Sequence, residues 1–179
     1  QYEGWMFEKI NALPPLIPFQ DGTNLPLNGQ TITIHIAYDK SRKNTSISLK
    51  EKQLIVFTNQ DDPHVRISRW IKTYAKNALR VISEEKALTI SKKIENVTVR
   101  DTKSRWGSCS SDGNLSYSWR LIFAPPEALD YVVAHEVAHL VYLNHSKAFW
   151  NLCRDLSDDF LNGQYWMRHH GHELMRYGG

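Results

Sequence analysis

The stretch "VVAHEVAHLVYLNHSKAFW", residues Val132–Trp150, places three histidines and one glutamate in an otherwise apolar segment. His135 and His139 are four residues apart, so on a helix their side chains share one face, about 5–6 Å apart at Cβ. Both imidazoles can then reach one metal ion at roughly 2.0–2.1 Å. Glu136 projects about 100° away from them, so it suits contact with a water on the metal better than a ligand role. This H-E-x-x-H spacing predicts two zinc ligands and a general base.

The simpler alternative is a solvent-exposed helix that carries two histidines without a shared partner. That alternative predicts polar flanks, whereas the flanks here are "DYVVA" and "LVYL". Two buried imidazoles without a partner would have to stay neutral at a desolvation cost, and a metal removes that difficulty. The sequence therefore predicts one zinc ion per chain.

A catalytic zinc needs a third protein ligand and an open position. We favour His145, which lies six residues beyond His139, just past the end of a helix expected over Pro126–Leu143. The spacing matches the metzincin pattern, but Tyr142 stands where those proteins have glycine, and Met167 is interpreted as a core residue. The competing ligand is a carboxylate of the next helix, and the candidates are Asp155, Asp158 and Asp159.

The N-terminal third is expected to be an irregular arm followed by strands. Residues 1–29 are rich in proline and show little periodicity. "TITIHIAY" alternates strictly between apolar and polar residues, as a half-buried strand does. Together with residues 45–49 and 53–59 it predicts an antiparallel β-meander over residues 30–60.

Residues 61–179 are expected to form the helical and catalytic part of one domain that spans residues 1–179. The patterns predict a helix from Asp62, a second short helix over 83–90, a strand over 95–101 and a hairpin that turns at Asp112-Gly113. Ser146 is expected to cap a further helix and Asn144 to be left-handed, and a last helix is expected over 164–177. The helix over 126–143 should place its histidines opposite an apolar stripe formed by Leu129, Val133, Val137, Leu140 and Val141.

Composition limits the class of protein. The 179 residues are 41% hydrophobic and 23% charged, which is typical of a globular chain. No apolar run reaches the roughly 18 residues of a membrane span, and the N-terminus lacks the pattern of a signal peptide. Two cysteines, Cys109 and Cys153, are too few for a disulfide scaffold and are expected to be reduced. We therefore expect a cytoplasmic protein without a membrane partner.

The block from Ser104 to Trp150 contains several uncommon elements in order: Arg-Trp-Gly-Ser-Cys, Trp-Arg-Leu, Ala-Pro, Asp-Tyr-Val-Val, His-Glu-x-x-His and Asn-His-Ser-x-x-Phe-Trp. In this block the chain resembles the YgjP-like metallopeptidases, relatives of the SprT-like and WLM zinc proteases. "DKSRKNTSISL" and "YWMRHHG" extend the resemblance, which departs at Ser118, where we expect asparagine, and at Asn44, where we expect a basic residue.

The resemblance implies an α+β, zincin-like fold, in which an antiparallel sheet packs on the active-site helix and a β-meander precedes it. It also implies zinc ligands at His135, His139 and His145 and a catalytic glutamate at Glu136. The leading hypothesis is a zinc-dependent metallopeptidase that hydrolyses peptide bonds of a protein or peptide substrate. Several candidates for a second oxyanion donor stay open: Tyr131, Tyr142, His169, His170 and His172.

Two alternatives remain. The first is a zinc-stabilised binding module without turnover, although a structural zinc site prefers four protein ligands. The second is a DNA-associated protease similar to the SprT-like relatives, for which nucleic acid is the less favoured partner because the net charge is only +3. The cations that support this second alternative are Arg42, Lys43, Lys92, Lys93, Arg100, Lys103 and Arg105.

The "HHGH" segment, which contains His169, His170 and His172, is either a second metal site or, as we favour, a polar helix end. The oligomeric state stays open.

Overall fold

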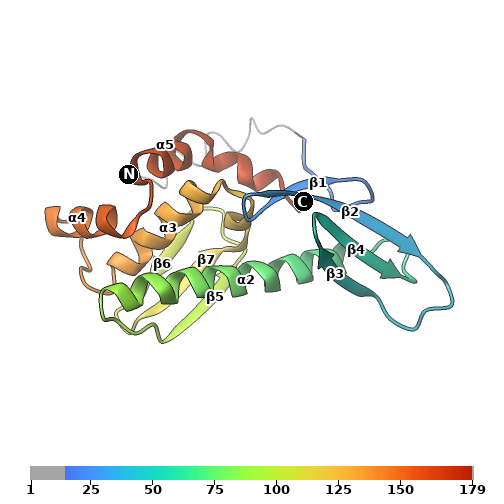
Figure 1. The fold of residues 1–179 in the computed structure, drawn as a ribbon, viewed down its shortest axis with the longest axis horizontal. Helices are drawn as coiled ribbons and strands as arrows, with labels where there is room; N and C mark the ends of the chain where they lie inside the picture. Colours follow the sequence, from blue (N-terminus) through green and yellow to red (C-terminus); the bar gives the residue numbers. More distant parts are fainter. Residues whose placement is uncertain (1–14, 179) are drawn as a thin grey trace.

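The structure is a computed structural model, and residues 15–178 are described. A four-stranded sheet forms one end of the molecule, and a long helix runs from it beneath a second region of helices and a smaller sheet (Figure 1). The order in the four-stranded sheet is β1-β2-β4-β3. Its strands are β1 (Asn24–Leu27), β2 (Gln30–Tyr38), β3 (Ser46–Lys50) and β4 (Gln53–Thr58).

This sheet corrects two expectations. Within the supposedly irregular arm, residues 24–27 form β1, which pairs antiparallel with β2; residues 1–14 of the arm lie outside the described residues. The β-meander over 30–60 is also wrong, because β4 pairs parallel with β2 and places β3 at the far edge. Alternation correctly predicts that Ile32 and Ile34 face the core, but it carries no information about which strands are neighbours.

The long helix α2 (His64–Thr89) is continuous over 26 residues, so the separate helix expected over 83–90 is wrong. Ser83 is buried inside α2, where its hydroxyl donates to the Leu79 carbonyl (2.7 Å) and lies 2.9 Å from the Tyr117 hydroxyl. Ser83, which in the sequence suggests the start of a helix, therefore lies inside α2 and contacts β7. At the true start, Asp62 Oδ1 accepts a hydrogen bond from the His64 N–H (2.9 Å).

The second sheet has the order β5-β7-β6, from β5 (Asn96–Arg100), β6 (Gly107–Cys109) and β7 (Asn114–Ser118). β6 and β7 form the expected hairpin, and Gly113 takes a positive φ of 80° in its turn. β5 pairs parallel with β7, so this sheet is mixed rather than antiparallel as expected. A 3₁₀ helix, η1 (Trp119–Phe123), leads from β7 to the next helix.

Helix α3 (Pro126–Ala138) ends five residues earlier than expected, with His139 as its C-terminal cap. The expected left-handed residue is also wrong: Asn144 has no positive φ, and its Oδ1 instead accepts from the Ser146 N–H (3.2 Å). Ser146 caps α4 (Lys147–Leu156) as predicted, by accepting from the Phe149 N–H. The early end of α3 leaves His145 in the connection between the two helices.

The last helix, expected over 164–177, is divided into α5 (Phe160–His170) and a 3₁₀ helix, η2 (Gly171–Arg176). α5 packs closely on α3 at Gly163, where a Cβ atom would lie 2.2 Å from the Glu127 carbonyl oxygen. Lys86 of α2 forms a nearly buried ion pair with Asp130 of α3 (2.5 Å) and donates to the Leu156 carbonyl (2.6 Å). Helix α3 thus packs on α5 at Gly163 and is joined to α2 by the Lys86–Asp130 ion pair.

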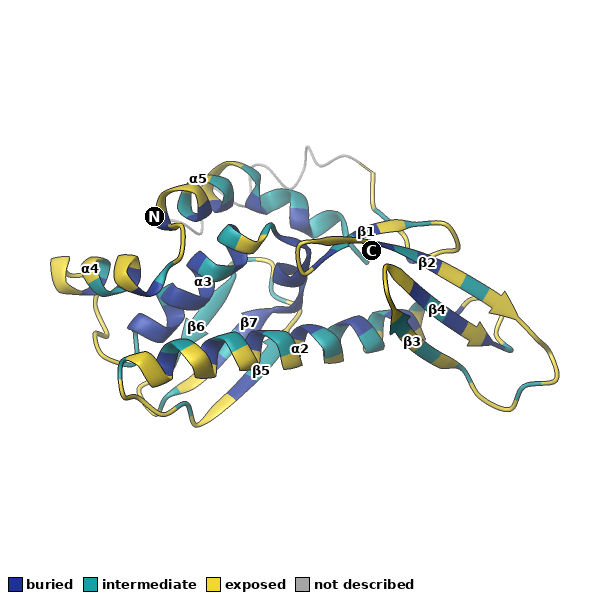
Figure 2. Ribbon diagram, viewed as in Figure 1, coloured by how far each residue is buried: buried dark blue, intermediate teal, exposed yellow. Residues whose placement is uncertain are grey.

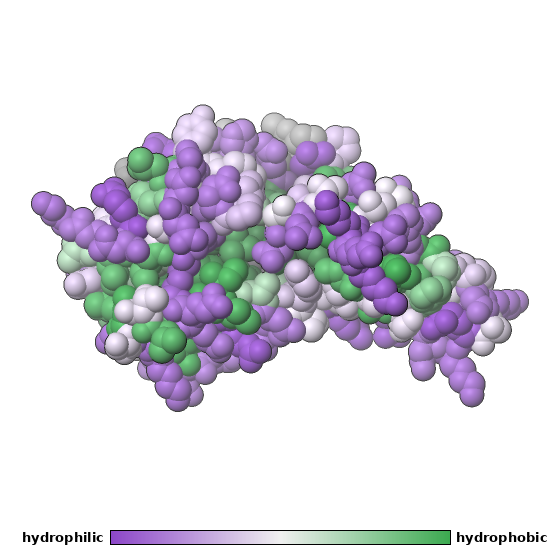
Figure 3. All heavy atoms as spheres, in the orientation of Figure 1, coloured by the Kyte–Doolittle hydropathy of each residue, from purple (hydrophilic) through white to green (hydrophobic). Residues whose placement is uncertain are grey.

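Burial follows this arrangement. Figure 2 shows α3 among the most buried elements, whereas α4 and the strand ends near the β2–β3 loop are largely exposed. In Figure 3, hydrophobic side chains gather over the half of the molecule where α2 and α3 end, and the tip formed by the β2–β3 loop is hydrophilic. Among residues 15–178, no helix is both long and apolar enough to cross a membrane.

The close contact between α3 and α5 predicts that Gly163→Ala destabilises the protein. The added methyl group cannot fit 2.2 Å from a backbone oxygen, so the two helices must separate, at an expected cost of about 2 kcal/mol or more. Chemical denaturation would measure this loss. Leu161→Ala, at a 69% exposed position of the same helix, is the control and should change stability little. Equal stability of the two variants would contradict the packing described for α3 and α5.

Candidate metal centre

Three imidazoles converge where α3 ends. One ring nitrogen from each of His135, His139 and His145 lies within 4.8 Å of the other two. Two of these atoms, Nε2 of His135 and Nε2 of His145, are 3.1 Å apart. Ligands at roughly 2.0–2.1 Å in a tetrahedral site lie about 3.3–3.4 Å from one another, so this spacing is close to that of a metal centre. The predicted set of histidines is therefore brought together.

A hydrogen bond orients His139. Its Nδ1 donates to the Tyr142 carbonyl oxygen at 2.9 Å, which fixes the proton on that nitrogen. The lone pair of Nε2 is then free for a ligand role. Such a contact to a backbone carbonyl is the usual way in which proteins fix the tautomer of a metal-binding histidine.

Aromatic residues of α4 support the three imidazoles. The buried ring of Phe149 lies 4.9, 4.5 and 4.7 Å from the ring centroids of His135, His139 and His145, respectively. Trp150 lies 5.6 Å from the rings of His135 and His145. The contact of Phe149 with all three histidine rings was not predicted from the sequence. The signal available was its position four residues after His145, on the first turn of a helix capped by Ser146.

The surroundings favour the neutral form of His135 and of His145. Burial, together with the nearby His139 and His145, lowers the pKa of His135 to about 3, and burial also lowers the pKa of His145. A neutral imidazole has the lone pair that a metal needs, so no proton has to be displaced from these two residues at neutral pH.

Glu136 is buried on the side of α3 that faces β6. A Cβ atom at Gly107 would lie 2.5 Å from Glu136 Oε1, so only glycine allows the carboxyl group to approach the strand this closely. Burial raises the pKa of Glu136 to about 8, and the positive charge of Arg105 opposes that shift. A divalent cation beside it would lower this pKa and favour the carboxylate. The close contact between Gly107 and Glu136 was not predicted from the sequence. The position of Gly107 within the Arg-Trp-Gly-Ser-Cys element was the available signal.

The residues present fit a catalytic metal ion better than a structural one. Within residues 15–178, no fourth His, Cys, Asp or Glu joins the cluster of three histidines. The competing carboxylates lie elsewhere: Asp159 caps α5 by accepting from the Asn162 N–H, and Asp155 and Asp158 line a different depression beside Lys86 and Asp130. His145 and the neighbouring connection are exposed, so a fourth coordination position would face solvent.

The other predicted residues are spread around the cluster. Tyr131 is buried, with its ring 6.2 Å from that of His135, whereas Tyr142 contributes its carbonyl to His139. His169 donates to the Tyr165 carbonyl and His170 pairs with Glu173, both at 2.9 Å. In the described part of the chain, His169, His170 and His172 form no group of potential metal ligands. Tyr131 and Tyr142 are thus the oxyanion candidates adjacent to the histidines.

Neither cysteine is suited to nucleophilic chemistry. Cys109 and Cys153 are free, and burial raises the pKa of their thiols to about 11 and about 12, with the charge of Glu136 adding to both shifts. Both thiols stay protonated at neutral pH.

The seven cations considered for DNA binding do not form one surface. Arg42 and Lys43 lie in the β2–β3 loop at one end of the molecule, and Lys92 and Lys93 follow α2 at the other end (Figure 1). Arg42 is also engaged, over the ring of Phe57 (5.2 Å) and by donation to Ser46 Oγ (3.1 Å).

The low pKa of His135 predicts how the metal-free protein responds to acid. The unfolded chain takes up a proton near pH 6.5, whereas folded His135 does not until about pH 3, so the contribution of His135 to the free energy of unfolding should fall as the pH drops through this window. Glu136, whose pKa is raised, contributes in the opposite direction, so the contribution of His135 is measured as the difference between wild type and variant. Urea denaturation of chelator-treated protein at pH 7, 6 and 5 would measure the two slopes. His135→Gln should lower the slope of the free energy of unfolding against pH by up to about 1.4 kcal/mol per pH unit. His169→Gln, which removes an exposed histidine, is the control; an identical slope in wild type and His135→Gln would contradict the burial described.

Comparison with known proteins identifies the family of the chain. The family model described as "YgjP-like, metallopeptidase domain" matches residues 2–170. No curated protein sequence matches the chain. Among solved structures, the metallopeptidase zymogen of Pyrococcus abyssi abylysin aligns at 18% identity and a TM-score of 0.45, covering 52% of this chain and 95% of that chain. The match over residues 2–170 confirms the resemblance and the α+β, zincin-like class: the chain belongs to the YgjP-like metallopeptidase family.

Proposed function

We propose that the chain is a zinc-dependent peptidase in which His135, His139 and His145 hold one zinc ion and Glu136 is the general base. The convergence of three imidazole nitrogens within 4.8 Å carries this proposal. Neutral imidazoles without a thiolate suit zinc, and three protein ligands with an exposed fourth side are typical of catalytic zinc sites. Metallopeptidase chemistry itself follows from the family.

When bound, zinc supplies Lewis-acid chemistry, since it acidifies water and polarises a carbonyl group. The chain contributes the proton transfers. Glu136 accepts the proton of the attacking water and returns it to the nitrogen of the leaving amine. Its burial against Gly107 excludes bulk water from the carboxyl group and limits the positions that the group can take. Tyr131 is the candidate donor for the developing oxyanion, because its ring lies beside His135.

The surface beside the histidines suits a polypeptide substrate. A depression of about 310 Å³ adjoins His139, and it is lined by the apolar side chains of Val141 and Leu143 together with the cations of Lys92 and Lys93. Val141 and Leu143 are 38% and 70% exposed, so apolar side chains of a bound peptide can be buried there. The edge of this depression therefore offers both apolar and charged contacts next to the reacting centre.

The assignment of the third ligand predicts that His145→Ala loses most of its zinc, because two imidazoles alone leave half of a tetrahedral site to water. Elemental mass spectrometry of untagged protein should find about one zinc per chain in the wild type and a small fraction of that in the variant. His169→Ala is the matched control, since His169 lies outside the cluster. Stoichiometric zinc in His145→Ala would contradict the assignment.

The role of the base predicts that Glu136→Gln abolishes hydrolysis while zinc is retained. An amide of the same size cannot accept the proton, so turnover should fall by about 10²–10⁴-fold. Cleavage of a quenched-fluorescence peptide library, measured together with zinc content, would show this. Glu127→Gln, on the first turn of the same helix, should leave both unchanged. Wild-type activity in Glu136→Gln would exclude the mechanism, and absence of cleavage by the zinc-loaded wild type would instead favour a binding module.

A further inference from the structure

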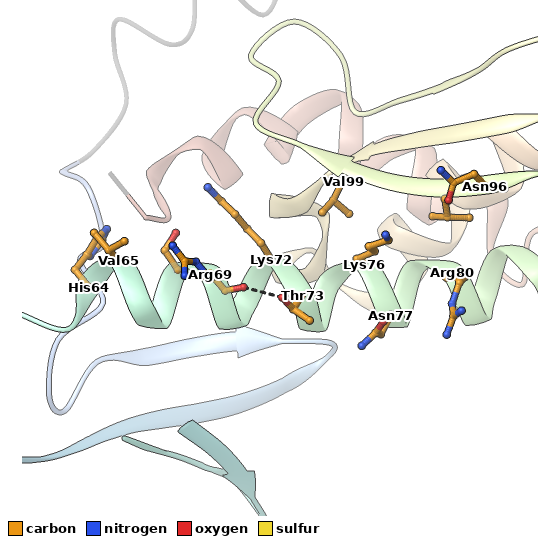
Figure 4. A pocket seen from close by; sticks show the side chains of 12 residues that line it. His64, Val65, Arg69, Lys72, Thr73, Lys76, Asn77, Arg80, Asn96 and Val99 are labelled. Atoms are coloured by element: carbon orange, nitrogen blue, oxygen red, sulfur yellow. Dashed lines mark hydrogen bonds between the residues drawn. The ribbon is translucent and has the colours of Figure 1, made fainter. Parts of the chain in front are cut away.

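A groove lined by none of the three histidines runs along α2. It has a volume of about 890 Å³ and is bounded by α2 on one side and by Asn96, Val97 and Val99 of the edge strand β5 on the other. Figure 4 shows these side chains along α2: Lys72 and Lys76 extend toward Val99 and Asn96, whereas Asn77 and Arg80 extend from the other side of the helix in this view. None of the residues assigned to the metal centre lines it.

Four cations follow one another along this groove: Arg69, Lys72, Lys76 and Arg80. They are three or four residues apart, so successive side chains leave the same side of the helix about 4.5–6 Å from each other along its axis. The row is thus about 16 Å long. No aspartate or glutamate lines the groove.

Most of this positive charge is not neutralised by other residues in the described part of the chain. Arg69, Lys76 and Arg80 form no ion pair with any residue between 15 and 178. Lys72 has only a long contact with Asp101 (3.8 Å), and its ammonium group lies 5.1 Å from the centre of the Trp119 ring. Like charges this close on one helix repel each other and cost stability, so their presence without partners indicates a ligand that carries negative charge.

The polar side chains between the cations indicate which class of anion the groove would bind. Ser68, Thr73, Asn77 and Asn96 line the same groove and can donate hydrogen bonds to phosphate or sugar oxygens. A row of regularly spaced cations with such donors in a concave surface matches a polymer with a regularly repeated negative charge better than a single small anion. A lipid surface is flat and would not enter the groove.

We propose that this groove binds the sugar-phosphate backbone of a nucleic acid. The contacts available are with phosphate and sugar, so binding is expected to be independent of base sequence. The surface differs from the scattered cations Arg42, Lys43, Lys92 and Lys93, and the proposal does not depend on the function proposed for the metal centre. A nucleic acid bound here would contact none of the three histidines through the residues that line the groove.

The test is the salt dependence of binding of the full chain to a labelled 20-base-pair duplex and to a 20-nucleotide single strand, measured by fluorescence anisotropy. The triple variant Arg69→Ala/Lys76→Ala/Arg80→Ala removes three exposed, unpaired cations. For the duplex, the slope of log K against log salt should become shallower by about 3, and for the single strand by about 2. Affinity at low salt should fall by at least about tenfold.

The control is Lys43→Ala/Lys92→Ala/Lys93→Ala, which changes net charge equally at exposed positions outside the groove. It should keep most of the affinity, and unfolding curves should show that both triple variants are folded. Absence of binding by the wild type at low salt, or equal loss in the two variants, would overturn the proposal. Binding of polyglutamate or of phosphatidylserine vesicles with the same dependence on the groove would also overturn it, because the surface would then be a general site for polyanions.

Discussion

The enclosure of helix α3 is the constraint on which the rest of the structure depends. Its buried side chains pack against the second sheet, α2, α4 and α5, and Gly163 and the Lys86–Asp130 pair allow the close approach of the neighbouring helices. An enclosed helix is a rigid support, so the side chains that it presents are held in fixed positions. His135 and Glu136 are adjacent in sequence but reach two different environments, one on the side of α4 and the other against β6.

The candidate centre follows from how this helix ends. Because α3 stops at Ala138 and the chain turns, His145 returns to face His135, and the ring of Phe149 contacts all three imidazoles from the following helix. The helix thus supplies two imidazoles, the connection supplies the third, and α4 supports them. Burial disfavours the charged form of both neighbouring groups, so it lowers the pKa of His135 and raises the pKa of Glu136.

The sequence predicts local structure better than the arrangement of the strands. Spacing predicted that His135 and His139 share a helix face and favoured His145 beside them, and the structure places the three together. It also correctly predicted the cap of α4 at Ser146, because these features depend on geometry over a few residues. The order and direction of β2, β3 and β4 could not be predicted, since an alternating pattern sets which side chains face the core and not which strand lies beside which. Ser83 and Gly107 show the same limit, because each depends on a contact with a residue about 30 positions away, Tyr117 and Glu136 respectively.

The central proposal is a metal ion held by three imidazoles with one position left open. X-ray absorption spectroscopy at the zinc edge, on zinc-loaded protein in solution, tests this proposal most directly. We expect scattering from three imidazole nitrogens at roughly 2.0–2.1 Å together with one light, non-imidazole neighbour. Scattering from sulfur, or from a complete set of four protein ligands, would contradict the proposal and would indicate a structural zinc site instead.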